Sequence, residues 1–516
     1  SSTPSYDEVQ YESFSYPQTH PTHLRAIASL FGLNPPEIAN ARVLELGCAS
    51  GGNLFPIAAV SPKAHFLGID LSQEQIARAK KINADLGLKN VEFLQQDILN
   101  FAPPSKEKFD YIICHGIFSW VPANVQEAVL KLCNEWLSPD GIALISYNAL
   151  PGWNAVRSLR EMMLYHTNRF TRPDEKVQQA RLLLDFLSES VPEGKSGYRS
   201  IIDEERALLK NINNTYLYHD HLESTNAQFY LHDFVTRANT HNLSYVGDSN
   251  LAWMYVDNMP PKAAETLKAI NDIVAQEQYM DFILNRRFRS TILCRADRPL
   301  NRNLRREQIM DYFLTINPAM EISGDDPKKD ITFKIGPNSF TTHEETTGTL
   351  FLELAACGNR AIAATDLVAR VQKKLNLPSP DPVREVLMSH GLPLVLKGYV
   401  LLRSDSPDFA AEVSDKPVAF PLARMEASMP GRNSVTNVLG HSLPSDIVGS
   451  AVLKNLDGTK TRDDIAGILT ALVKNGTLKM ERNGAPITDE EEIRRNAGVI
   501  FDDLLPRMAR SAVLVG

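Results

Sequence analysis

The chain has 516 residues, of which 43% are hydrophobic and 22% charged, so it is an ordinary globular protein too long for one core, and two to four domains are expected. Its net charge of −8 argues against nucleic acid or an anionic membrane as the main partner. The five cysteines are scattered, which excludes a disulfide framework and a structural zinc site and predicts a cytoplasmic protein without a metal. No long apolar span is visible, so no membrane-spanning segment is expected.

Residues 1–40 are predicted to form an N-terminal arm and a short helix. Between Tyr11 and Pro21, aromatic and polar residues mix without the period of a helix or a strand. Two interpretations stay open, namely an extended arm that only packs on the next domain and a lid over a ligand. The apolar spacing from Leu24 to Phe31 then predicts the helix.

The stretch from Val43 to Asn53 predicts a short buried strand, a glycine-rich turn and the start of a helix. Glu45 lies among apolar residues, where a carboxylate is costly unless something pairs with it. Gly47 and Gly51 permit turns with positive φ and let a ligand approach the bare main chain. This combination indicates a nucleotide-type cofactor at the carboxyl end of a parallel sheet, with a purely structural turn as the alternative.

Two further predicted strands end in an acid. Phe66 to Asp70 lies about 20 residues after the first motif, where an acid can accept hydrogen bonds from both ribose hydroxyls of an adenosine. Val91 to Asp97 ends in a third acid. A dinucleotide fold has no regular use for that acid, whereas an adenine-edge contact in an S-adenosylmethionine site explains it.

From Arg42 to Ser146 the residues resemble the class I S-adenosylmethionine-dependent methyltransferases, with Glu45, Gly47 and Gly51 as the family's first motif. Ala49 stands where many members have glycine, and a slightly altered turn is expected there. The resemblance implies an α/β fold with a Rossmann-like, seven-stranded domain, S-adenosyl-L-methionine as cofactor and S-adenosyl-L-homocysteine as product. The cofactor site that it implies consists of Tyr11, Tyr16, His20, Glu45, Gly47, Cys48, Gly51, Asn53, Asp70, Leu71, Asp97, Ile98, His115 and Gly116.

Two segments narrow the resemblance to a subgroup of these methyltransferases. Tyr11 to Pro21 and Tyr147 to Trp153 look like the bacterial methyltransferases that carry a so-called methyltransferase regulatory region. That group includes protein-lysine methyltransferases acting on bacterial outer-membrane proteins. The resemblance runs the whole length of the chain, with its distinctive motifs before about residue 260, and membership alone does not fix the substrate.

The methyltransferase domain is predicted to span residues 41–298. Helical insertions are expected at about 153–226 and 258–286, where such enzymes place elements that recognise the substrate. The strands after the third are expected at 109–115, 142–146, 243–247 and, antiparallel to its neighbour, 289–295.

Residues 299–405 and 406–516 are predicted to form two winged-helix-like α+β domains. The first shows a hairpin around Gly336, helices at 365–375 and 382–390, and strands at 394–396 and 399–401. The second shows a helix that Thr461 caps, a hairpin at Asn483-Gly484 and a last helix from Glu490 to Leu505, after a linker at 407–430. Because residues 365–390 have no dense Lys/Arg face and the whole chain is acidic, protein docking or scaffolding is favoured over DNA binding.

Four residues are candidates for catalysis. His115 ends the fourth strand and could take the proton of an amine acceptor, or it could only line the cofactor. Tyr147 and Asn148 end the fifth strand and could orient the amine, or only stabilise the next turn. Trp153 and Trp120 could line the site for the aliphatic stem of an acceptor, or they could simply belong to the core.

Three functions stay open. A protein-lysine N-methyltransferase is favoured, because the insertions and C-terminal domains are large enough to dock a protein substrate. A small-molecule methyltransferase and a non-catalytic S-adenosylmethionine-binding regulator are the alternatives. The sequence Cys114 to Phe118 lacks the Asn-Pro-Pro-Tyr that would favour DNA-adenine or glutamine-amide methylation. The target, the number of methyl groups and the oligomeric state do not follow from the sequence.

Overall fold

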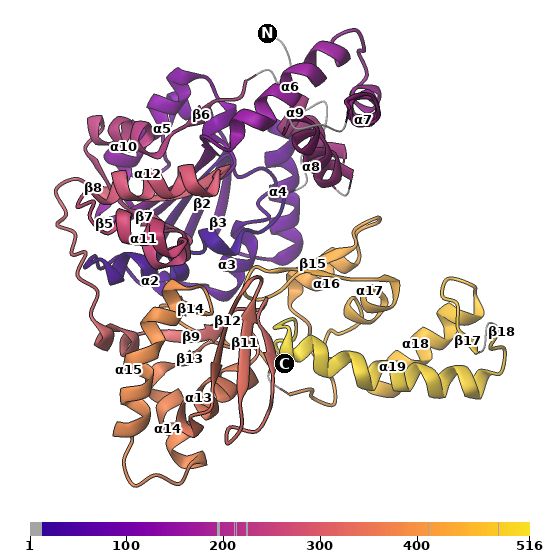
Figure 1. The fold of residues 1–516 in the computed structure, drawn as a ribbon. Coiled ribbons are helices and arrows are strands. Elements are labelled where there is room, and N and C mark those ends of the chain that lie inside the picture. Colours follow the sequence, from indigo (N-terminus) through magenta and orange to yellow (C-terminus); the bar gives the residue numbers. More distant parts are fainter. Residues whose placement is uncertain are drawn as a thin grey trace.

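The computed structural model describes residues 13–192, 197–210, 212, 214–222, 225–410, 412–482 and 485–516. Tyr11 and the predicted turn at Asn483-Gly484 lie outside these residues. Figure 1 shows one large sheet with helices on both faces, a group of helices beyond one end of it, and the C-terminal half on its other side. The last long helix extends away from the rest of the molecule.

One mixed sheet forms the centre of the N-terminal half. Its strands, in spatial order, are β3 (Val91–Gln95), β2 (His65–Asp70), β1 (Arg42–Leu46), β4 (Phe109–Cys114), β5 (Leu137–Ala149), β8 (Phe288–Arg295) and β7 (Leu243–Asp248). A short strand, β6 (Gln228–Phe229), pairs with the end of β5. The strands β1 to β5 run parallel, and β8 is antiparallel to both of its neighbours. The predicted seven-stranded Rossmann-like sheet, with its antiparallel last strand, is therefore confirmed.

Alternating residues of the strands feed two apolar cores, one on each face of the sheet. Val43 and Leu144 belong to the core that contains α2 (Pro21–Leu30) and α3 (Leu54–Val60), and Leu44 and Ile145 to the core on the opposite face. The other helices that cover the sheet are α4 (Gln73–Leu86), α5 (Ala123–Trp136) and α10 (Leu231–Thr240). Ser72 caps α4 as predicted, because its hydroxyl accepts a hydrogen bond from Gln75 N at 3.2 Å.

The segment between β5 and β6 is helical, as expected. It consists of α6 (Trp153–Thr167), α7 (Pro173–Ser190), α8 (Tyr198–Lys210) and α9 (Asn214–Leu222). These helices share a small core of their own, which includes Met163, Leu184 and Leu217. They lie beyond the end of the sheet in Figure 1, whereas α11 (Pro261–Leu267) and α12 (Ile273–Leu284) lie against its side. The four helices α6 to α9 are called the helical insertion below.

The first C-terminal unit contains the helices α13 (Glu345–Ala356), α14 (Ala364–Lys374) and α15 (Asp381–Leu396). They accompany a sheet of the order β13 (Ile362–Ala363), β9 (Phe313–Ile316), β14 (Val400–Arg403). The predicted hairpin around Gly336 is confirmed as β11 (Ile331–Ile335) and β12 (Asn338–Thr342), and β10 (Glu321–Ser323) extends it.

The predicted strand 394–396 is wrong, because α15 continues through Gly391 and Pro393 to Leu396. A Cβ atom at Gly391 would come within 2.7 Å of Ile309, so this glycine serves close packing inside the helix rather than ending it. The strand near 399–401 exists as β14, but its partner is β9, from about 85 residues earlier in the chain.

The second unit contains α16 (Pro421–Ala427), α17 (Ile447–Leu453), α18 (Arg462–Lys474) and α19 (Glu490–Arg510). Two short hairpins accompany them, β15 (Ser434–Thr436) with β16 (Ser442–Pro444) and β17 (Glu481–Arg482) with β18 (Ala485–Pro486). Thr461 caps α18 as predicted. The predicted linker 407–430 is wrong in part, because it contains α16 and because Val418 and Ala419 bridge to Asp457 and Leu514.

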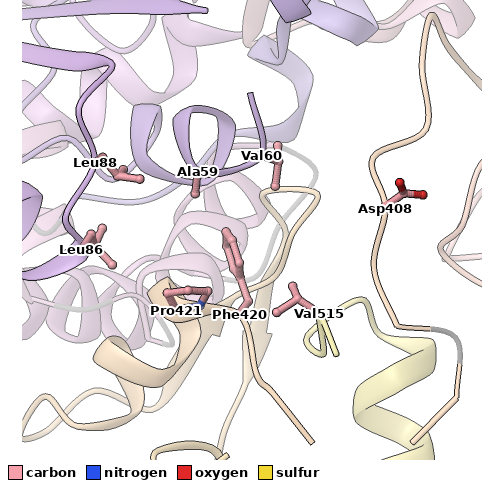
Figure 2. A pocket seen from close by; sticks show the side chains of 8 residues that line it. All are labelled: Ala59, Val60, Leu86, Leu88, Asp408, Phe420, Pro421 and Val515. Atoms are coloured by element: carbon pink, nitrogen blue, oxygen red, sulfur yellow. The ribbon is translucent and has the colours of Figure 1, made fainter. Parts of the chain in front are cut away.

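The two halves share packing around α2. Asn301 N donates to the carbonyl of Phe31 at 2.8 Å, and the hydroxyls of Ser29 and Tyr312 lie 2.9 Å apart. Figure 2 shows a cavity of about 390 Å³ at the second contact between the halves, where Ala59, Val60, Leu86 and Leu88 face the C-terminal unit. Seven of the eight residues that line it have apolar side chains, and they come from both halves of the chain.

A buried ionic cluster fixes α12 to the last two strands. The side chain of Arg289 is fully buried, with Nε 2.7 Å from Asp281 Oδ2 and Nη1 3.0 Å from Glu277 Oε2. Asp248 of β7 lies 3.6 Å from the same guanidinium, and Arg286 pairs with Asp281 at 2.6 Å. Removing one partner from such a cluster leaves uncompensated charges in the core.

We therefore expect Arg289→Met to lower the free energy of unfolding by about 3–5 kcal/mol. The control is Arg295→Met on the same strand, whose pair with Asp297 is exposed at 3.3 Å. That control should lose less than about 1 kcal/mol. Urea unfolding followed by circular dichroism measures both, and equal losses would contradict the assignment.

Candidate active site

A cavity of about 700 Å³ lies at the edge of the sheet where the parallel strands end. All five parallel strands contribute a residue to its wall at or just beyond their carboxyl ends, namely Gly47, Asp70, Asp97, His115 and Asn148. Of the other residues that the sequence predicted, Tyr16, Glu45, Cys48, Asn53, Leu71, Ile98, Gly116 and Trp153 also line it. The convergence follows from the topology, because parallel strands bring their carboxyl ends to one edge.

The glycine turn after β1 is held by the acid that ends β2. Asp70 Oδ2 accepts a hydrogen bond from Ala49 N and Oδ1 one from Ser72 N, both at 2.9 Å. Ala49 has a φ of +46°, so alanine adopts here the left-handed conformation that glycine supplies in many class I methyltransferases. Gly51 does not line the cavity, because the space where its Cβ would stand is filled by Phe93 and Phe55. Its positive φ and close packing shape the turn instead.

Glu45 is buried in the cavity wall, with only one oxygen engaged. Its Oε1 accepts a hydrogen bond from Asn53 Nδ2 at 2.8 Å, while Oε2 has no hydrogen-bond partner among the described residues. Burial raises the pKa of this carboxyl group to about 8. A ligand group that carries hydrogen-bond donors and positive charge would complete this site.

The N-terminal arm lies on the glycine turn. Gly52 N donates to Ser13 Oγ and Tyr16 N donates to Asn53 Oδ1, both at 2.8 Å. The ring of Tyr16 stands 4.3 Å from that of His115 between centroids, inside the cavity wall. His20 does not line the cavity. Its ring nitrogen instead accepts a hydrogen bond from Thr22 N at 3.2 Å and caps α2.

The predicted catalytic residues separate into two groups. Asn148 Nδ2, Trp153 Nε1 and His115 Nδ1 are buried in the cavity wall and have no hydrogen-bond partner in the described part of the chain. Burial lowers the pKa of His115 to about 4, so its ring is neutral and weakly basic. Trp153 meets Trp120 edge to face, with centroids 6.4 Å apart.

Tyr147 lies on the other face of the sheet. Its hydroxyl is 2.9 Å from Thr291 Oγ1 and its ring stacks on Phe234 at 4.1 Å. Successive side chains of a strand point to opposite faces, so Tyr147 is directed away from the cavity that Asn148 lines. This position gives no basis for the expected contact between Tyr147 and the acceptor.

The sequence analysis missed a cluster that the helical insertion brings to the cavity. Glu205 of α8 and His221 of α9 line it with Arg287, which precedes β8. His221 Nε2 is 2.8 Å from Glu205 Oε1, and Arg287 Nη2 donates to Glu205 Oε2 at 2.6 Å. The three residues are far apart in the sequence and belong to no motif, so only the fold identifies them.

The described residues contain neither a membrane-spanning helix nor a metal site. No helix there has both the length and the apolar character needed to cross a membrane. Among the same residues, no three or more His, Cys, Asp or Glu side chains are grouped so that they could hold a metal ion.

Three family descriptions match successive parts of the chain. They are a methyltransferase domain at residues 38–193, a methyltransferase regulatory domain at 213–295 and the C-terminal winged helix domain of PKMT at 415–513. An uncharacterised protein of Rickettsia prowazekii is 39% identical over 99% of this chain and 93% of its own length. The structure of PKMT2 from Rickettsia typhi in complex with AdoHcy is similar with a TM-score of 0.89, at 34% identity over 98% of this chain and 100% of that one.

The sheet, the cavity at its carboxyl edge and the matched domains define an S-adenosylmethionine-dependent methyltransferase with a C-terminal winged helix domain. Within that class, the chain belongs to the same family as PKMT2 of Rickettsia typhi and the full-length Rickettsia prowazekii relative. The cofactor expected from the sequence is confirmed by this membership.

The residues present fit S-adenosylmethionine. Asp70 and Asp97 bring carboxylate oxygens to the ends of β2 and β3, where they would accept hydrogen bonds from the ribose and the adenine edge. Leu71 beside them is 55% exposed, an apolar surface that a bound adenosine would cover. The buried Oε2 of Glu45 would receive the amino group of the cofactor's methionine part.

Because Glu45 has a pKa of about 8, it holds a proton at neutral pH and has to lose it before its carboxylate accepts a cation. We expect the affinity for S-adenosylhomocysteine to rise by up to about tenfold per pH unit between about pH 6 and 8, and then to level off. Glu45→Gln should bind more weakly with a flat pH profile. Calorimetric titration over this range measures both.

The matched control is Glu107→Gln, whose carboxylate is exposed and pairs with Arg42 outside the cavity. It should follow the wild-type curve. Parallel curves for wild type and Glu45→Gln would contradict the role of Glu45.

Proposed function

We propose that this enzyme transfers a methyl group from S-adenosylmethionine to the side-chain nitrogen of lysine in a protein substrate. The supporting observation is the cavity wall, which contains two tryptophans in contact with each other and a buried carboxylate, Glu205. A lysine side chain has a long aliphatic stem and a cationic end, which match an aromatic wall and a carboxylate. The full-length similarity to PKMT2, a protein lysine methyltransferase, supports the same acceptor.

When bound, S-adenosylmethionine supplies a methyl group on a positively charged sulfur, which an amine lone pair can take while the sulfur keeps the electrons of the broken bond. The chain's own residues would position that amine. Trp120 and Trp153 would hold the aliphatic stem. The side-chain amide of Asn148, near the end of β5, would contact the acceptor nitrogen in the cavity. Holding the amine about 3 Å from the methyl carbon accounts for much of the rate that positioning can give.

The N-terminal arm is proposed to cover the bound cofactor. Ser13 and Tyr16 bond to the glycine turn, and Tyr16 stands in the cavity wall, where its ring could face a sulfonium.

We further propose that the arm spans residues 1–40, the methyltransferase domain 41–298 and the two C-terminal domains 299–405 and 406–516. We also propose that the enzyme is cytoplasmic and acts on its protein substrate there.

The helical insertion is proposed to dock the protein substrate. Phe186 on α7 is 61% exposed and Leu208 on α8 is 49% exposed, and Leu208 belongs to the cavity wall. Apolar side chains beside the acceptor end of a cavity offer contact area to a polypeptide. The C-terminal domains, on the other side of the sheet, would supply a separate docking surface.

The test is methyl transfer from labelled cofactor to unfolded fragments of bacterial outer-membrane proteins, followed by acid hydrolysis and amino-acid analysis. Methylated lysine is the expected product. A labelled small molecule, or cofactor binding without any transfer, would contradict the proposal and favour one of the two alternatives.

Trp153→Ala should raise KM for the protein fragment by about 3–10-fold, since an aromatic contact contributes about 0.5–1.5 kcal/mol. Cofactor affinity should stay unchanged. The control is Trp136→Ala, because Trp136 packs on Phe101, 5.7 Å between centroids, outside the cavity. If both variants raise KM equally, the tryptophan wall is not the acceptor site.

A further inference from the structure

The cluster of Glu205, His221 and Arg287 has a specific arrangement of donors and acceptors. Arg287 occupies one oxygen of Glu205, and His221 Nε2 lies 2.8 Å from the other. Burial raises the pKa of Glu205, but the hydrogen bonds from His221 and Arg287 lower it more, so the net pKa is below the ordinary value and the group is ionised. An ionised carboxylate only accepts hydrogen bonds, so Nε2 of His221 carries a hydrogen.

This tautomer leaves the other nitrogen of the ring as an acceptor. In a neutral imidazole that holds its hydrogen on Nε2, Nδ1 presents a lone pair. Nδ1 of His221 is buried and has no hydrogen-bond partner among the described residues, and the side chain belongs to the cavity wall. A carboxylate that holds a histidine in this way also stabilises the protonated ring, as in the triads of hydrolases.

His115, the other histidine of the cavity, lacks these features. No carboxylate bonds to its ring in the described structure, and it lies against the rings of Tyr16 and Phe288. Its pKa of about 4 means that it would hold a proton poorly. The two histidines therefore have different environments, and of the two only His221 has a carboxylate bonded to its ring.

We propose that His221 is the general base of this enzyme and that Glu205, held by Arg287, positions it. The proposal rests on lysine as the acceptor. A lysine side chain enters as an ammonium ion, which has no lone pair to react. One N–H bond of the ammonium breaks, its electron pair stays on the nitrogen, and the proton bonds to Nδ1 of His221. The imidazolium that forms is stabilised by Glu205, and it releases the proton to water after the product leaves.

The other charged and titratable side chains that line the same cavity come from several elements. The described ones are Glu205 on α8, Arg287 before β8, Tyr16 in the arm, Glu45 on β1, Cys48 after β1, Asp70 on β2, Asp97 after β3 and His115 after β4.

The test is the pH profile of methyl transfer to a lysine-containing protein fragment by His221→Gln. The glutamine amide can still donate to Glu205 but cannot take a proton. We expect kcat at pH 7 to fall by about 100-fold, the lower range for loss of a general base. The rate of the variant should then climb with pH and approach the wild-type rate near pH 10, where free lysine amine becomes abundant. Cofactor affinity by calorimetry should not change.

A second variant, Glu205→Gln, keeps the ring but removes the charge that stabilises its protonated form. Its rate at pH 7 should fall, since the imidazolium that forms during transfer no longer has a carboxylate beside it. The control is His241→Gln at the end of α10, whose ring lies 2.6 Å from Glu127 Oε2 outside the cavity and the helical insertion. It should behave as wild type.

Two results would overturn the inference alone: wild-type kcat for His221→Gln at pH 7, or a loss that high pH does not recover. The second would mark a structural role. A wild-type enzyme that methylates no lysine would instead overturn the proposed function, and the inference with it.

Discussion

The side-chain amide of Asn53 connects the parts that define the cofactor cavity. Its nitrogen donates to Glu45 at the end of β1 and to Thr19, and its oxygen accepts from the backbone of Tyr16. The contacts with Glu45 and Thr19 are buried and the one with Tyr16 is partly buried, and a missing partner in a buried site is costly. An amide presents two donors and an acceptor at this position, whereas a carboxylate would have no donors for Glu45 and Thr19. The side chain of Asn53, in the glycine turn, is thus hydrogen-bonded both to the end of β1 and to the N-terminal arm.

Much of the site could be predicted from the sequence, because one rule of sheet topology determines where its residues lie. Residues that follow parallel strands meet at one edge, so Gly47, Asp70, Asp97 and His115 could be grouped without coordinates. The rule gives the edge but not the direction of each side chain. His20, Gly51 and Tyr147 were expected in the site because their neighbours belong there, whereas a helix cap, a packed turn and the alternation of β5 direct them elsewhere.

Long-range contacts explain what the sequence could not supply. Gly391 and Pro393 are ordinary signals for the end of a helix, yet Ile309 from another segment fills the space beside Gly391 and the helix continues. The pairing of β14 with β9 also depends on a strand that no local pattern indicates. Glu205 and His221 come from an insertion whose sequence has no motif, so their meeting with Arg287 is a property of the fold alone.

The N-terminal arm also contacts the second C-terminal unit. A Cβ atom at Gly440, within the winged helix domain, would stand 2.7 Å from the hydroxyl of Ser15 and 4.0 Å from Pro56 of α3, so this glycine lies against both the arm and the methyltransferase domain. A side chain at position 440 would therefore press on the arm at Ser15. The placement of the arm on the glycine turn thus depends on the C-terminal domain as well as on the methyltransferase domain.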